Sequence, residues 1–318
     1  MRLFRDLNHS SLSAGSVVTI GNFDGLHRGH QALVERCHAW DGEGLERAVI
    51  TFEPLPQAWF SPASAPSRLT SPRQKLELLD GMGIDLVWMM RFNQELADIP
   101  ARVFVERVLR DAMQARHVVV GDDFRFGRKR EGDLDMLEAL GREYGFSVEI
   151  VAEVIDEQGR ISSSAVRNAL QAGDFDRAGS LLGRPWTMQG HVFKGAQLGR
   201  RLGYPTANMK LAAKPCPIAG IFAVRARIED DPAGAWLDGV ANLGRRPAVG
   251  GGEFLAEVHL FDYDRDLYGR RMQVRFVEKI RDEANFSTLE ALTAQMHIDA
   301  AKARAILGNR VEQAQVTD

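Results

Sequence analysis

The chain has 318 residues, of which 45% are hydrophobic and 26% are charged, and its formal net charge at pH 7 is -3. These values are typical of a globular protein, and the length favours two domains. A slightly acidic chain lacks the basic surplus that a nucleic-acid-coating protein needs, so we expect no nucleic-acid partner.

The cysteines Cys37 and Cys216 lie far apart in the sequence and form no CxxC motif. This spacing argues against a disulfide framework or a thiolate metal site and fits a reducing compartment. The N-terminal residues contain no apolar segment of signal-peptide length, and no run approaches the ~20 apolar residues of a membrane span. We therefore expect a cytoplasmic protein with no membrane partner.

Alternating strand and helix patterns occupy the first half of the chain. The predicted strands cover residues 16–21, 47–52, 85–92, 117–121 and 146–151, and the predicted helices cover residues 30–40, 72–81, 101–113, 133–144 and 164–172. Short, continuous strands rich in Val and Ile, separated by helices, are typical of a parallel sheet that is covered on both faces.

The pattern changes near Arg184, where strands of alternating polarity follow one another without helices between them. These strands are predicted at residues 220–228, 239–244, 254–263 and 271–280. They indicate an antiparallel sheet closed into a small barrel. We accordingly expect an α/β protein whose domains cover residues 1–184 and 185–318.

An amphipathic helix is predicted at the end of the chain. Ser287 and Glu290 form a capping-box pattern at its start, and Gly308 is expected to stop it. The apolar stripe of this helix consists of Leu289, Leu292, Met296, Ala303 and Ile306.

Four unusual loops follow the ends of strands in the first half. They read GNFDGLHRGH after the first strand, EPLP after the second, GDDFRFGRKR after the fourth and GRISSSAVR beyond the fifth. In an open parallel sheet, ligands bind where loops leave the carboxyl ends of the strands. We therefore expect these loops to converge on one edge of the sheet.

His27 and His30 lie in the first of these loops, at the start of a predicted helix. Gly29 lets the backbone approach a phosphate, and the helix N-terminus offers free N–H groups and a positive dipole end. Imidazole N–H donors could stabilise the charge on a transferring phosphoryl group. A lone loop histidine usually has no such role, and an HxxH pair is common by chance. Zinc binding is a further alternative, although no third ligand has a telling spacing.

Ser162, Ser163 and Ser164 supply hydroxyl groups at the start of another helix, and Arg167 follows one turn later. This group makes a second anion site, suited to a pyrophosphate leaving group. The combination of HxGH with ISSSxxR is more specific than either motif alone.

The segments TIGNFDGLHRGH, TFEPLP and VVVGDDFRFG, with the serine motif, resemble the nucleotidyltransferase superfamily. More closely, they are similar to the FAD synthetase module of bacterial bifunctional riboflavin kinase/FAD synthetases. The resemblance implies a Rossmann-like nucleotidyltransferase domain in which Gly21, Asn22 and Asp24 shape the nucleotide pocket. It also implies that Asp123 and Phe124 line the flavin pocket, although Phe124 could equally be a core aromatic, the commoner state of a phenylalanine.

The second half contains the glycine-rich segment GHVFKGAQLGRRLGYPTANM. Gly195 and Gly199 suggest backbone that can press against phosphates, and Lys194 and Arg200 supply positive charge. No Walker A sequence occurs, which argues against a P-loop fold. On its own, such a loop is more often a solvated surface hairpin.

Thr206 and Asn208, in the PTAN motif of this segment, carry hard oxygen atoms of the kind that Mg²⁺ accepts beside ATP phosphates. In the predicted strand 254–263, Glu257 shares a face with His259, whereas Ala256 and Val258 face the other way. An acid on the mixed face is most often a plain surface charge. It is also placed as a general base would be, to accept a proton from a substrate hydroxyl.

The motifs GxVxxGxxxGRxLGxPTAN, GVANLGRRP, EVHLFDYDRDLYG and FVEKIRDEANF resemble the riboflavin kinase module. The resemblance implies a six-stranded antiparallel barrel in which Thr206 and Asn208 hold Mg²⁺ with ATP and Glu257 is the catalytic base. Ala248 stands where the family usually has threonine, Leu55 where a polar residue is common, and Ser164 where threonine is usual. None of these departures touches the residues assigned to chemistry, so we expect them to alter affinity more than activity.

The sequence as a whole is identified as a member of the bifunctional family, with ATP as co-substrate and riboflavin, FMN and FAD as substrates and products. The barrel would phosphorylate riboflavin to FMN, and the first domain would join FMN to AMP, giving FAD and pyrophosphate. Two alternatives stay open: only one module is active, or the chain is a non-catalytic flavin-binding regulator. A pantetheine- or nicotinamide-type nucleotidyltransferase would share HxGH but would not explain the second half.

Overall fold

The computed structural model describes residues 1–5, 15–195, 199, 202–210, 215–229, 231, 234–245 and 254–315. The chain forms two compact units. The first consists of Met1–Pro66 and Pro72–Ser163, and the second consists of Ser67–Ser71 and Ser164–Asp318.

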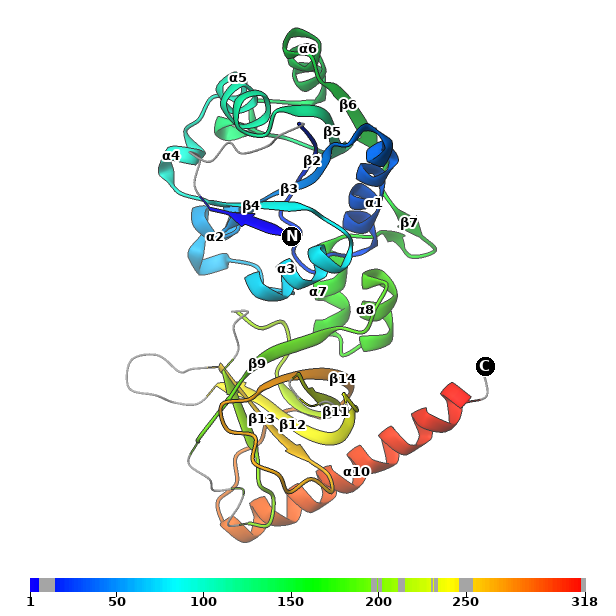
Figure 1. Cartoon of the computed structure of the whole chain (residues 1–318). Coiled ribbons are helices and arrows are strands. Elements are labelled where there is room, and N and C mark those ends of the chain that lie inside the picture. The colour runs from blue at the N-terminus through cyan, green and yellow to red at the C-terminus, as the bar shows by residue number, and fades with distance from the viewer. Residues whose placement is uncertain are drawn as a thin grey trace. The chain divides into compact units, whose positions relative to one another are not determined.

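A parallel sheet of six strands forms the centre of the first unit (Figure 1), with the strand order β1-β4-β3-β2-β5-β6. The strands are β1 (Arg2–Phe4), β2 (Ser16–Ile20), β3 (Glu46–Glu53), β4 (Leu86–Arg91), β5 (Ala115–Gly121) and β6 (Ser147–Val151). The predicted parallel sheet is confirmed. The pattern missed the short strand β1 of this sheet, and also β7 (Ile155–Asp156) and β8 (Gly159–Arg160), which pair with each other, because such brief strands show no periodicity.

The helices of this unit include those predicted, some with shifted ends, and two short helices, α2 and α4, that were not predicted. They are α1 (Arg28–Cys37), α2 (Pro56–Phe60), α3 (Pro72–Gly81), α4 (Gln94–Ala97), α5 (Ala101–Phe104) and α6 (Leu134–Tyr144). Asp133 caps α6 by accepting a hydrogen bond from the Met136 N–H at 3.0 Å, and Gly145 ends it with a φ of 80°. The predicted helix over residues 101–113 is instead α5 followed by π-helical turns over Val105–Ala112.

The core of the first unit lies on both faces of the sheet. Every residue of β2 is buried. Val18 and Ile20 pack into one apolar cluster with side chains of the π-helical turns and α6, whereas Val17 packs into another with Cys37. Burial raises the pKa of Cys37, and likewise that of Cys216, to about 12, and both cysteines are free. The thiol groups therefore stay protonated and unreactive at neutral pH.

A closed antiparallel barrel forms the centre of the second unit, with the strand order β10-β13-β12-β11-β14-β9. The strands are β9 (Thr187–Phe193), β10 (Ala207–Lys210), β11 (Gly220–Ile228), β12 (Leu237–Arg245), β13 (Phe254–Leu260) and β14 (Arg271–Arg281). The predicted barrel is confirmed. Strands β9 and β10 were not predicted, because the glycine-rich segment between them hides their alternation.

Two helices that precede the barrel in the sequence, α7 (Ser163–Gln171) and α8 (Phe175–Leu182), belong to its compact unit from Ser164 onward. Phe175 of α8 packs edge-on against Phe222 of β11, with the ring centres 5.9 Å apart. The Trp186 indole N–H donates to the Leu69 carbonyl at 3.0 Å. The chain therefore passes from the first compact unit to the second between Ser163 and Ser164, and the domain boundary expected near Arg184 stays a prediction.

The long helix α10 (Leu289–Gln315), red in Figure 1, lies along the barrel and packs on β11, β12 and β14. Its start differs from the predicted capping box, because the Thr288 hydroxyl, and not that of Ser287, accepts the Ala291 N–H at 3.1 Å. Leu289 is 53% exposed and so lies outside the buried stripe. Gly308 does not stop the helix, which continues for two further turns, because a glycine within a helix costs only about 1 kcal/mol. Among the described helices, none combines the length and the apolar character that crossing a membrane requires.

A buried ion pair fastens α10 to the barrel. Asp299 is 4% exposed and accepts hydrogen bonds from the Arg281 guanidinium, at 3.0 Å from Nε and 2.6 Å from Nη2. A second pair between the helix and the barrel, Arg304 with Asp262, is exposed and is therefore expected to contribute little.

We predict that Asp299→Ala lowers the free energy of unfolding of the second unit by about 3 kcal/mol, because it leaves a partly buried guanidinium without its carboxylate. Urea unfolding followed by circular dichroism measures this change. Asp262→Ala is the matched control and should leave the midpoint almost unchanged. Equal midpoints for the two variants would contradict the assignment.

Candidate active sites

A cavity of about 770 Å³ lies in the first unit, lined by the loops that leave β2, β3 and β5 and by Ser162 and Ser163. The expected convergence of these loops on one edge of the sheet is therefore present. From the first loop, the residues Gly21, Asn22, His27, Gly29 and His30 line the cavity.

The turn between β2 and α1 holds an unusual backbone conformation. Phe23 and Leu26 have φ values of 47° and 46°, in the left-handed region that side chains other than glycine rarely adopt. Both side chains are fully buried and pack against Val34 and Leu79. Their burial offsets the cost of the backbone conformation, of order 1–3 kcal/mol for each residue. The turn is therefore held in one shape by the core beneath it.

His27 and His30 meet at the start of α1. Their rings stack with centres 3.7 Å apart, and His27 caps the helix, since its Nδ1 accepts the His30 backbone N–H at 3.4 Å. Because Nδ1 is the acceptor, the neutral His27 ring carries its proton on Nε2 and keeps an N–H donor. A Cβ on Gly29 would lie 3.1 Å from the His27 ring. The glycine thus leaves room for the His27 ring.

The serine motif is tied to the same turn. Ser163 donates from its hydroxyl to the Asp24 carbonyl at 2.9 Å. Asp24 itself is 1% exposed and is not one of the residues that line the cavity. Ser164 and Arg167 belong to the second unit, where Arg167 Nε donates to the Ser67 carbonyl at 2.6 Å. Their expected role in binding pyrophosphate stays a prediction.

The loop after β5 contributes Asp123 and Phe124 to the cavity. Asp123 accepts a hydrogen bond from Arg160 at 2.5 Å. The Phe124 ring stacks on Phe126 with centres 5.5 Å apart and packs against the core, while its role in binding flavin stays a prediction. Leu55 is 3% exposed and belongs to the core, which accounts for an apolar residue at this position.

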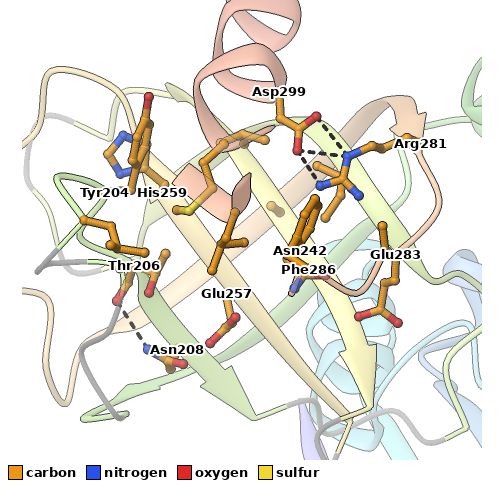
Figure 2. Close-up of a pocket in the computed structure, with 18 residues that line it drawn as sticks. Tyr204, Thr206, Asn208, Asn242, Glu257, His259, Arg281, Glu283, Phe286 and Asp299 are labelled. Atoms are coloured by element: carbon orange, nitrogen blue, oxygen red, sulfur yellow. Dashed lines mark hydrogen bonds and ion pairs between the residues drawn. The ribbon is translucent and has the colours of Figure 1, made fainter. Parts of the chain in front are cut away.

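A second cavity, of about 210 Å³, opens on the barrel and is lined by Gly199, Thr206, Asn208 and Glu257 together with residues of α10. Strand register places Asn208 of β10 directly opposite Glu257 of β13, and Asn242 of β12 opposite it on the other side. Figure 2 shows Glu257 between these two amides. The predicted alternation of β13 is present, since Ala256 and Val258 are fully buried while Glu257 faces the cavity.

Close packing explains two glycines of the glycine-rich segment. A Cβ on Gly195 would lie 2.7 Å from the Asn208 side-chain amide, and a Cβ on Gly199 would collide with the Tyr204 carbonyl. Lys194 is exposed and does not line the cavity. Arg200 lies outside the described residues, as does Ala248.

Sequence reasoning missed several residues of the barrel cavity. They are Tyr204, Asn242, His259, Arg281, Glu283 and Asp299. Asn242 faces the cavity because β12 pairs with β13 in a register that places Asn242 opposite Glu257, and a single sequence does not show which residues pair.

Glu283 follows β14, and its carboxyl group occupies the space that a Cβ on Gly244 would fill. Burial raises the pKa of the Glu283 carboxyl, Arg281 lowers it, and the Glu257 charge raises it further.

Tyr204 links the glycine-rich segment to α10. Its hydroxyl lies 2.5 Å from His297 Nδ1, and its N–H donates to the Gly199 carbonyl at 2.8 Å. The turn that leads into Thr206 is therefore held from two sides.

Comparison with known proteins assigns both units. Residues 9–165 match the FAD synthetase family, and residues 182–307 match the riboflavin kinase family. A bifunctional riboflavin kinase/FMN adenylyltransferase of Pseudomonas fluorescens is 45% identical over 310 residues, which are 96% of this chain and 98% of that protein. The chain belongs to the family of bifunctional riboflavin kinase/FMN adenylyltransferases.

A further relative and a solved structure are also similar to the whole chain. The bifunctional riboflavin kinase/FMN adenylyltransferase of Escherichia coli (strain K12) is 42% identical over 315 residues, which are 97% of this chain and 98% of that protein. A crystal structure described as a macrolide-efflux protein from Streptococcus pneumoniae has a TM-score of 0.77 and 29% identity, covering 94% of this chain and 96% of its own. The chain therefore carries riboflavin kinase and FMN adenylyltransferase activities, with ATP and flavins as substrates.

We predict that Tyr204→Phe raises the KM for ATP of the riboflavin kinase about fivefold, because the loss of one hydrogen bond, about 1 kcal/mol, loosens the turn before Thr206. Steady-state rates with varied ATP measure this change. Tyr263→Phe is the control, since the buried Tyr263 hydroxyl has no hydrogen-bond partner among the described residues. Equal KM values for both variants would refute the role of Tyr204.

Proposed function

We propose that the barrel cavity phosphorylates riboflavin and that the cavity at the sheet edge adenylylates the FMN formed. The catalytic modules would then be residues 1–184 and 185–318, a division supported by the extents of the two family matches, 9–165 and 182–307. The single observation that carries the proposal is the placement of Glu257 between Asn208 and Asn242 on the face of the barrel that lines its cavity.

In the kinase step, Glu257 accepts the proton of the terminal ribityl hydroxyl of riboflavin. The hydroxyl oxygen then attacks the γ-phosphorus of ATP, and ADP leaves. Positioning and charge stabilisation supply most of the acceleration of such a transfer, so the barrel needs no covalent intermediate. Gly195 and Gly199 leave space for side chains and backbone beside Asn208 and Thr206, where the phosphates of ATP would lie.

The donor set beside Glu257 fits a magnesium ion. Asn208 is 4% exposed, lies opposite Glu257 in the strand register, and has Thr206 two residues before it. Hydroxyl, amide and carboxylate oxygens are the hard ligands that Mg²⁺ prefers. Thr206 and Asn208 would hold the ion, which when bound with ATP neutralises charge on the phosphates. The contribution of Lys194 and Arg200 to binding ATP stays an expectation from the sequence.

In the adenylyltransferase step, a phosphate oxygen of FMN attacks the α-phosphorus of ATP, forming FAD and releasing pyrophosphate. His27 and His30 would donate hydrogen bonds to the oxygens on which charge develops. Gly21, Asn22 and Gly29, with Asp24 behind them, would shape the nucleotide pocket. The N-terminus of α1 adds its N–H groups at the same place.

The remaining ligands of this step come from three further segments. Asp123 and Phe124 would contact the flavin, and Ser162, Ser163, Ser164 and Arg167 would receive the pyrophosphate. The cytoplasmic location and the absence of nucleic-acid and membrane partners stay predictions from the sequence.

We predict that Glu257→Gln reduces riboflavin phosphorylation at least a hundredfold, because the amide cannot accept the proton, while FMN is still converted to FAD. Chromatography of the products formed from riboflavin or FMN with ATP and Mg²⁺ measures both steps. Loss of both steps together would contradict separate sites.

We predict that His30→Ala makes the protein accumulate FMN from riboflavin and ATP, with FAD formation reduced about a hundredfold, as for loss of one preorganised donor. The same chromatography checks this outcome, and the rate of FMN formation is the internal control for folding. Undiminished FAD output would refute the role of His30.

A further inference from the structure

Lys75, in the middle of α3, is fully buried. A lysine is almost never buried to this extent unless polar groups satisfy its ammonium, because removing the charge from water is costly. The residue is also not one of those that line the cavity of the first unit. Its burial therefore requires an explanation other than contact with a substrate.

Three hydrogen bonds join Lys75, Thr51 and Asn22 to one another in a ring. The Lys75 Nζ donates to the Asn22 carbonyl at 2.6 Å and to the Thr51 hydroxyl oxygen at 3.0 Å. The Thr51 hydroxyl in turn donates to the same Asn22 carbonyl at 3.1 Å. The Asn22 carbonyl thus accepts one hydrogen bond from Lys75 of α3 and one from Thr51 of β3. The bond from Lys75 is the stronger of the two, because its donor is charged.

Asn22 is the residue at which the unusual turn begins. The Gly21 N–H donates to the Ile50 carbonyl at 3.0 Å, as a continuation of the sheet. Immediately after Asn22, Phe23 and Leu26 adopt the left-handed backbone. Fixing the Asn22 carbonyl therefore fixes the direction in which the chain leaves the sheet, and with it the position of the turn that leads to His27.

We propose that Lys75 is a positioning residue for FMN adenylylation, which holds the Asn22–Leu26 turn so that His27 and His30 face the transferring phosphoryl group. The inference rests on the proposed role of these histidines. Lys75 acts through Asn22 and Thr51 and touches no substrate. Because the histidines act on the transition state, a small displacement of the turn lowers kcat more than it raises KM.

Substitutions of Thr51 test the hydrogen bonds among Lys75, Thr51 and Asn22 with the smallest change to the buried core. Thr51→Val keeps the shape of the side chain and removes only the hydroxyl, whereas Thr51→Ser keeps the hydroxyl and is the matched control. We expect Thr51→Val to lower the kcat of FAD formation about tenfold, with KM values for FMN and ATP within about twofold of wild type. Thr51→Ser should retain at least about half of the wild-type kcat.

Lys75→Met removes the ammonium at nearly constant volume, and we expect it to lower the kcat of FAD formation about a hundredfold. Riboflavin phosphorylation, measured in the same samples, should keep its wild-type kcat in all three variants. If Lys75→Met does not fold in the first unit, the comparison of Thr51→Val with Thr51→Ser decides the question.

Equal kcat values for Thr51→Val and Thr51→Ser, in protein that circular dichroism shows to be fully folded, would overturn the proposal. A loss that appears only in KM, or that follows the fraction of unfolded protein, would show a merely structural role and would also overturn it. His30→Ala separates this failure from that of the proposed function: if that variant forms FAD normally, the role of the histidines falls, whatever the result at Thr51.

Discussion

Every residue of β2 is buried, because side chains pack against both faces of the sheet at this strand. A strand without an exposed face gives a ligand no access along its length. Side chains that act on a ligand can therefore be placed only where the chain leaves the strand, and there the backbone turns sharply through Phe23 and Leu26. The core supports this turn from below. The position of His27 and His30 follows from that support rather than from contacts of the histidines alone.

In the barrel, by contrast, a residue within a strand can face a ligand. Its strands alternate, so one face of β13 packs inward while Glu257 on the other face is available to a ligand. Neighbouring strands then set what surrounds the acid, and register places an amide on each side. The glycines at 195, 199 and 244 remove side-chain bulk where Asn208, Tyr204 and Glu283 need the space. Sites on rigid strands hold their geometry more tightly than sites on loops.

Much of this could be predicted from the sequence because hydrophobic periodicity reports burial directly. The parallel sheet, the barrel, the loop convergence and the face of Glu257 all follow from period or from strand direction. What could not be predicted depends on pairing between distant segments. Asn242 gains its meaning only from its register with Glu257, and Glu283 only from its contact with Gly244. The end of α10 was missed because Gly308 weakens a helix without having to break it.

The five residues Ser67–Ser71 belong to the compact unit of the barrel although they lie within the first half of the chain. The Leu69 carbonyl accepts the Trp186 indole N–H, and the Ser67 carbonyl accepts a hydrogen bond from Arg167. A fragment that starts at residue 185 would keep every barrel strand yet lose these partners, together with α7 and α8. Excising the kinase as a stand-alone protein would thus remove the Leu69 partner of Trp186 and the Phe175 ring that stacks on Phe276, and the apolar surface uncovered in this way favours aggregation.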